Sequence, residues 1–108
     1  MRDMVSRVVF VCEEDKAMFE LVKGKYNLYY RCMKYDRENR QDNENVCMNR
    51  LSLKDAYMMY SILEDLENKG RLTAGASGRE KWIDYKIISA DDELIFVTIY
   101  NHNYLKGV

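Results

Sequence analysis

The chain has 108 residues, of which 47% are hydrophobic and 32% charged, and its formal net charge is −1. This balance excludes an intrinsically disordered chain and predicts one domain with a core of its own. It also excludes a global electrostatic attraction to nucleic acid or to an anionic membrane, so any such binding requires a local patch.

Tyrosine and methionine are prominent, with nine and seven copies, whereas the chain has one histidine and no proline. Tyrosine packs in cores and also serves wet interfaces, so this composition indicates a protein that binds rather than one that catalyses. Many Lys, Asn, Tyr and Ile residues without Pro are typical of an AT-rich bacterial, phage or mobile-element genome.

The first predicted element is a strand over residues 5–12, which has apolar side chains on both faces and therefore belongs inside a sheet. Its apolar run, residues 8–12, is too short for a signal peptide or a membrane span. We therefore expect no membrane contact and a cytoplasmic location, in the cell of origin or in a host cell.

Residues 13–24 allow two interpretations. Acidic residues at 13–15, helically spaced apolar residues over 17–22 and Gly24 as a stop favour a short N-terminal helix. In the alternative, residues 13–16 form a hairpin turn and 17–22 a strand.

Residues 26–35 predict a strand with two different faces. One face carries Tyr26, Leu28, Tyr30 and Cys32, and the other carries Asn27, Tyr29, Arg31 and Met33. Residues 36–45 contain no apolar side chain and predict a solvated loop, and residues 46–48 predict a short return strand.

The best-defined element is a helix over residues 53–69. Ser52 and Asp55 form a variant of the capping box, and Gly70 stands where a C-terminal glycine belongs. Its apolar stripe consists of Leu53, Ala56, Tyr57, Met59, Tyr60, Leu63 and Leu66. Two further apolar residues lie outside this stripe, which predicts that loops or a partner cover the back of the helix.

The remaining chain predicts a loop over residues 71–81 and a hairpin formed by 82–89 and 93–100, with 90–92 as its turn. Residues 101–108 predict a frayed tail.

Together these elements predict a single α+β domain over residues 1–108. It has a mostly antiparallel sheet of four to five strands, one long helix at about 53–69 and a short N-terminal helix. The element order follows the split βαβ order of ferredoxin-like domains, an analogy of fold that carries no function.

Zinc binding is the first candidate function of the cysteine and histidine residues. Cys12, Cys32, Cys47 and His102 offer a Cys3His ligand set, but no two of them have the close spacing of structural zinc sites. An odd number of cysteines also argues against a disulfide framework. We expect three reduced, buried thiols, no metal site and no other cofactor.

Catalytic chemistry finds little support. Asp84 and Lys86 have the acid-x-Lys spacing of one class of metal-dependent nucleases, but the acidic residues 91–93 lie at the wrong end of the hairpin to complete such a site. His102 falls in the predicted tail, where a general base is not held rigidly. We predict no catalytic residues and no enzyme activity, and keep a metal-dependent nuclease as a third hypothesis.

A basic loop provides the alternative function. Residues 75–78 match a GxxG pattern, but they follow a helix and precede a strand, the reverse of a phosphate-binding loop. Five residues around it combine basic charge with an aromatic ring, as in modules that bind single-stranded nucleic acid: Lys69, Arg71, Arg79, Lys81 and Trp82.

A set of aromatic and apolar residues provides the main hypothesis. These fall on faces that the simplest core does not need: Tyr29, Met33, Tyr35, Met58 and Ile62. They either cover the second side of a thin domain or form an interface, which favours Tyr and Met. The sequence thus predicts a small non-enzymatic protein that binds another protein or itself, as an accessory or inhibitory factor. A homodimer through a strand edge or the helix at 53–69 is its simplest form.

Overall fold

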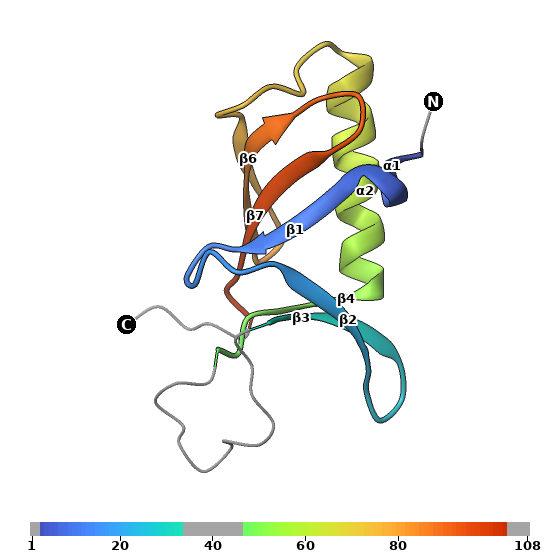
Figure 1. Ribbon diagram of the computed structural model, residues 1–108, viewed down its shortest axis with the longest axis vertical. Helices are drawn as coiled ribbons and strands as arrows, with labels where there is room; N and C mark the ends of the chain where they lie inside the picture. Colours follow the sequence, from blue (N-terminus) through green and yellow to red (C-terminus); the bar gives the residue numbers. More distant parts are fainter. Residues whose placement is uncertain (1–2, 34–46, 104–108) are drawn as a thin grey trace.

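The computed structural model describes residues 3–33 and 47–103 (Figure 1). Its elements are, in chain order, α1 (Met4–Arg7), β1 (Val8–Cys12), β2 (Phe19–Lys23), β3 (Leu28–Cys32), β4 (Arg50–Ser52), α2 (Leu53–Asn68), β5 (Ser77–Glu80), β6 (Ile83–Ala90) and β7 (Ile95–Asn101). The predicted α+β class is confirmed, with one long helix, one short helix and strands in two sheets.

The larger sheet has the strand order β1-β7-β6-β5 and lies against α2 (Figure 1). Strand β1 pairs in parallel with β7, and the other two pairs are antiparallel. The core lies between α2 and this sheet: Leu63 and Met59 of the helix are fully buried with Ile87 of β6 and Val97 of β7. This sheet has four strands, and the strands predicted for one sheet are divided between it and a second sheet of three.

The smaller sheet, β2-β3-β4, is antiparallel and lies beyond the N-terminal end of α2 (Figure 1). A bridge between Val11 and Met18 joins it to the end of β1. Aromatic contacts fix it to the core, since the Tyr30 ring lies 5.6 Å from that of Phe10 and the Tyr30 hydroxyl lies 3.1 Å from that of Tyr60.

The predicted helix over residues 13–24 is wrong, and the alternative of a turn followed by a strand is the one observed. The Cys12 N–H donates to the Ala17 carbonyl at 2.7 Å, and the Lys16 N–H donates to the Cys12 carbonyl at 2.8 Å, which closes the turn. Lys16 adopts a φ of 58° within it. The short helix is α1 instead, where Asp3 caps the Ser6 N–H at 3.0 Å.

Without a helix between β1 and β2, the ferredoxin-like element order lacks its first crossover. Other boundaries also move. Residues 5–7 are helical rather than extended, residues 47 and 48 precede the return strand β4 instead of forming it, and β5 forms inside the predicted loop over residues 71–81. Residue 46 and the predicted loop over residues 36–45 lie outside the described part of the chain.

The long helix was predicted well. Ser52 Oγ accepts a hydrogen bond from the Asp55 N–H at 3.1 Å, and Gly70 after the helix has a φ of 69°. The buried stripe is narrower than predicted, because Tyr57 is 59% exposed. The predicted hairpin forms as β6 and β7, with a register shift between Ile87 and Ser89.

The prediction of a frayed tail over residues 101–108 is wrong for its first two residues. Asn101 is fully buried at the end of β7, and the His102 N–H donates to the Trp82 carbonyl at 2.8 Å. Residues 104–108 lie outside the described part of the chain. Among the described helices, none is long and apolar enough to cross a membrane.

Candidate functional site

Three methionines form a row just beyond the strand ends of the smaller sheet, where Met18 precedes β2, Met33 follows β3 and Met48 precedes β4. The Met33 N–H donates to the Met18 carbonyl at 3.1 Å, which places Met18, just before β2, opposite Met33, just after β3. The Cys32 N–H donates to the Asn49 carbonyl at 3.1 Å, and this register sets Met48 beside Met33 on the other side. The three side chains are 50%, 51% and 42% exposed for Met18, Met33 and Met48 respectively.

Arginine and tyrosine continue the same face toward the hairpin end. Glu20, Arg31 and Arg50 are aligned across the three strands, and Arg31 forms an ion pair of 3.0 Å with Glu20. The Arg50 guanidinium lies 5.4 Å from the centre of the Tyr29 ring. We call these residues and the methionine row the outer face: Met18, Glu20, Tyr29, Arg31, Met33, Met48 and Arg50.

A hollow of about 510 Å³ adjoins the outer face at the β2–β3 turn. Tyr29 and Arg50 belong to both surfaces, and Lys25, Tyr26 and Lys54 also line the hollow. All charged side chains that line the hollow are basic, and the rings of Tyr26 and Tyr29 lie beside them.

The structure separates the predicted interface residues. Tyr29 and Met33 lie on the outer face, whereas Met58 and Ile62 are partly buried on α2 and pack against the core. Tyr35 lies outside the described residues. Sequence reasoning missed Met18 and Met48, because only the strand register brings them beside Met33.

A second group, which we call the cysteine–aspartate cluster, lies at the C-terminal end of β1. Its members are Cys12, Asp15, Cys32 and Cys47, and their sulfur and carboxylate ligand atoms all lie within 4.8 Å of one another. Cys12 ends β1, Asp15 follows in the turn, Cys32 ends β3, and Cys47 precedes β4. Cys12 and Cys32 are fully buried.

Hydrogen bonds connect the cluster to the sheets. The Sγ atoms of Cys12 and Cys47 lie 3.6 Å apart, and the Asn49 side-chain amide donates to Cys12 Sγ at 3.2 Å. The thiol of Cys47 lowers the pKa of Cys12 to about 6, and the Asn49 amide adds to this effect. The same contact raises the pKa of Cys47.

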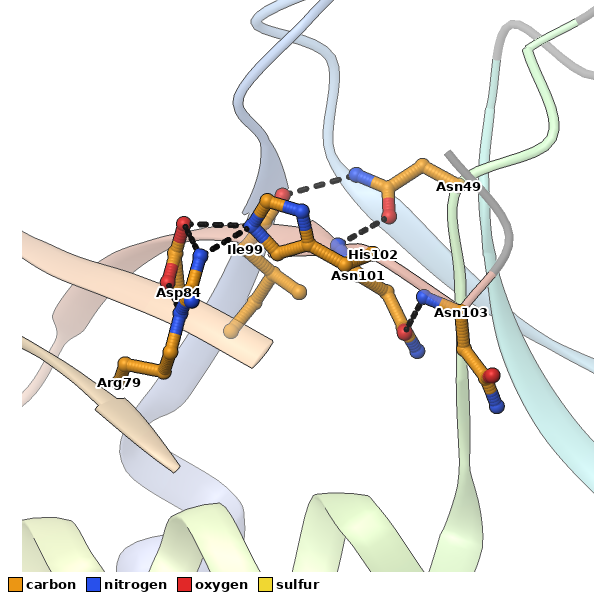
Figure 2. Close-up of polar contacts among 7 residues, drawn as sticks. All are labelled: Asn49, Arg79, Asp84, Ile99, Asn101, His102 and Asn103. Atoms are coloured by element: carbon orange, nitrogen blue, oxygen red, sulfur yellow. Dashed lines mark hydrogen bonds and ion pairs between the residues drawn. The ribbon is translucent and has the colours of Figure 1, made fainter. Parts of the chain in front are cut away.

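A third group joins Arg79, Asp84 and His102 at the edge of the larger sheet (Figure 2). Arg79 donates to both carboxylate oxygens of Asp84, at 2.6 and 3.2 Å, and His102 Nε2 lies 2.7 Å from Asp84 Oδ2. These contacts, the arginine first, lower the pKa of Asp84 to about 2. His102 is thus held in place rather than frayed.

Acidic residues of the β1–β2 turn lie near this third group. Glu13 and Glu14 line a hollow of about 420 Å³ together with Asp84 and His102. Sequence reasoning looked for a further carboxylate at residues 91–93 and missed these two. Asp84 is held in an ion pair with Arg79, and Glu13 and Glu14 add carboxylates near it, so the nuclease hypothesis stays a prediction.

The predicted nucleic-acid residues divide between the two ends of β5. Lys69 and Arg71 follow α2 at one end, whereas Lys81 and Trp82 form the β5–β6 turn at the other (Figure 1). Lys69 pairs with Asp65 at 2.9 Å, and Arg79 pairs with Asp84. Binding of nucleic acid through these residues remains a prediction.

Comparisons with family models, curated proteins and solved structures found no match for this chain.

Proposed function

We propose that this protein is a small non-enzymatic binding protein that contacts a protein partner through its outer face. The observation that carries the proposal is the methionine row, three side chains that are about half exposed and that the strand register brings side by side at one end of a short sheet. Methionine is flexible and polarisable, and surfaces that bind protein partners use it for this reason.

The composition of the rest of the outer face supports the proposal. Interfaces are enriched in Tyr, Met and Arg, and the outer face carries Tyr29, Arg31 and Arg50 beside the three methionines. The single acidic member, Glu20, is paired with Arg31, so its charge is largely compensated.

The adjoining hollow indicates the chemistry of the partner. Lys25, Arg50 and Lys54 favour a carboxylate, while the rings of Tyr26 and Tyr29 favour an apolar or aromatic group beside it. We infer that the partner presents an acidic side chain next to apolar ones. A second copy of this chain is the simplest partner to test.

Substitution of Met33→Lys tests the proposal, because it places a charge in the middle of the row. Ile88→Lys is the matched control, since Ile88 of β6 is 48% exposed and Met33, which follows β3, is 51% exposed. Light scattering over a concentration series measures self-association. Capture from the native host followed by mass spectrometry measures binding of other proteins.

We expect the wild type and Ile88→Lys to behave alike, and Met33→Lys to bind at least ~10-fold more weakly, as for a central interface residue. A Lys54→Glu variant should weaken the same contact in a salt-dependent manner. If Met33→Lys binds as well as the wild type, the outer face is not the contact surface.

A further inference from the structure

The cysteine–aspartate cluster brings four ligand groups from three segments of the chain to one point. We propose that this cluster binds one Zn²⁺ in tetrahedral geometry, through three thiolates and one carboxylate oxygen, as a structural site that fastens the smaller sheet to β1. The inference is independent of the proposed function.

The spacing of the ligand atoms fits zinc. Zn–S bonds of about 2.3 Å and Zn–O bonds of about 2.1 Å in a tetrahedron place neighbouring ligand atoms roughly 3.5–3.8 Å apart. In the structure, Cys12 Sγ lies 3.6 Å from Cys47 Sγ and 3.8 Å from Asp15 Oδ2, and Cys32 Sγ lies 3.5 Å from the same oxygen. All four ligand atoms lie within 4.8 Å of one another, so little movement is needed.

Two ligands also have the local spacing that structural zinc sites show. Cys12 and Asp15 are separated by two residues, as are the cysteines of a C-x2-C pair, and carboxylates are accepted zinc ligands. The Lys16 N–H donates to the Cys12 carbonyl at 2.8 Å, which folds the turn so that Asp15 returns toward Cys12. A search for Cys and His alone does not find this pair.

The surroundings support bound thiolates. The Asn49 amide donates to Cys12 Sγ at 3.2 Å and to the Ile99 carbonyl at 2.8 Å, so the donor is held in place by β7 (Figure 2). Such outer hydrogen bonds orient metal ligands and stabilise the charge on sulfur. Asp15 is exposed whereas Cys12 and Cys32 are buried, so the ion enters from the side of the turn.

The binding reaction balances simply. Each thiol that is still protonated releases its proton to the solvent, and Zn²⁺ accepts a lone pair from each of the three thiolates and one from the Asp15 carboxylate. No oxidation occurs. Soft thiolates with tetrahedral geometry select zinc over the hard ions magnesium and calcium.

The test uses the full-length protein, purified under reducing conditions without a chelator. Its zinc content is measured by inductively coupled plasma mass spectrometry, and its affinity by titration with Zn²⁺. Titration with Co²⁺ serves as a probe of geometry, since tetrahedral thiolate sites give thiolate-to-cobalt charge transfer and intense visible absorption. We expect one equivalent of metal and a rise in melting temperature on adding Zn²⁺.

Asp15→Asn and Glu14→Gln form a matched pair, because each removes one exposed carboxylate from the same turn. We expect Asp15→Asn to weaken zinc binding at least ~10-fold and Glu14→Gln to leave it unchanged. Cys32→Ser should weaken the thiolate-to-cobalt absorption, because it removes one of the three sulfur ligands. Because Cys32 is fully buried, the exposed Asp15 variant keeps the proposal testable if Cys32→Ser does not fold.

Several results would overturn the proposal. One is a reduced, folded protein that binds no zinc at a tenfold excess of the metal. Another is zinc binding that is equal in the wild type and Asp15→Asn. A third is isolation of the protein with a Cys12–Cys47 disulfide, seen as a loss of two hydrogens in the intact mass, with no metal taken up after reduction.

Discussion

Asn49 accepts a hydrogen bond from the main-chain N–H of Asn101 at 3.1 Å, while Asn101 donates through its side-chain amide to the Arg50 carbonyl at 2.8 Å. Both residues are fully buried. These two hydrogen bonds, both donated by Asn101, join Asn49 and the start of β4 to the end of β7, and so join the two sheets. They also hold the amide that donates to Cys12.

Replacement of Asn49 should therefore destabilise the protein. Asn49→Ala leaves the Ile99 carbonyl and the Asn101 N–H without their partner, and we expect a loss of about 3 kcal/mol in the free energy of unfolding. Asn103→Ala is the control, since that side chain is exposed, and should change it by less than about 0.5 kcal/mol. Urea denaturation measures both, and equal stability of the two variants would contradict the assignment.

The Arg7–Glu67 ion pair should contribute more to the free energy of unfolding than an exposed ion pair does. Arg7 is 5% exposed, pairs with Glu67 at 2.7 Å and donates to the Asp91 carbonyl at 3.1 Å. Glu67→Gln leaves a buried guanidinium with reduced compensation, and because Glu67 itself is partly exposed we expect a cost of about 2 kcal/mol.

Asp65→Asn provides the comparison. Both side chains of the Asp65–Lys69 pair are exposed, so this pair should contribute at most about 0.5 kcal/mol to the free energy of unfolding. Thermal or urea unfolding distinguishes the two. A Glu67→Gln protein as stable as Asp65→Asn would show that Arg7 does not depend on its partner.

The Arg79–Asp84–His102 group should make stability depend on pH in the acidic range. The pKa of Asp84 is lowered from 3.8 to about 2, so the folded state favours the ionised carboxylate. Its contribution is therefore fully present above pH 3.8 and is lost as the pH falls through about 2.

The difference in melting temperature between the wild type and Asp84→Asn should thus be constant near neutral pH and shrink below pH 4. High salt should reduce it as well, because Asp84 is 38% exposed. A difference that grows as the pH falls would contradict the direction of the shift.

The elements that were predicted correctly are defined by residues close to one another in the sequence. The cap at Ser52, the glycine at position 70 and a helical period define α2 without reference to the rest of the chain. The hairpin of β6 and β7 is similarly local. Strand β2 was the less favoured of two interpretations because Leu21 and Val22 fit both a helical and a strand period, and only pairing with β3 decides between them.

The candidate sites depend on contacts distant in sequence, which explains why they were only partly predicted. Met33 and Tyr29 were identified from a strand period, but Met18 and Met48 join them through the register of three strands. Likewise, Asp15 became a potential ligand only once the turn after Cys12 was known.

Oxidation of methionine to its sulfoxide tests the outer face most directly. In the dilute chain, Met18, Met33 and Met48 should react with peroxide much faster than the buried Met4 and Met59, as read by mass spectrometry of peptides. On self-association or partner binding, these three should become protected while the buried pair remains unreactive. A row already protected in the dilute chain, or equally reactive in the complex, would contradict a partner on the outer face.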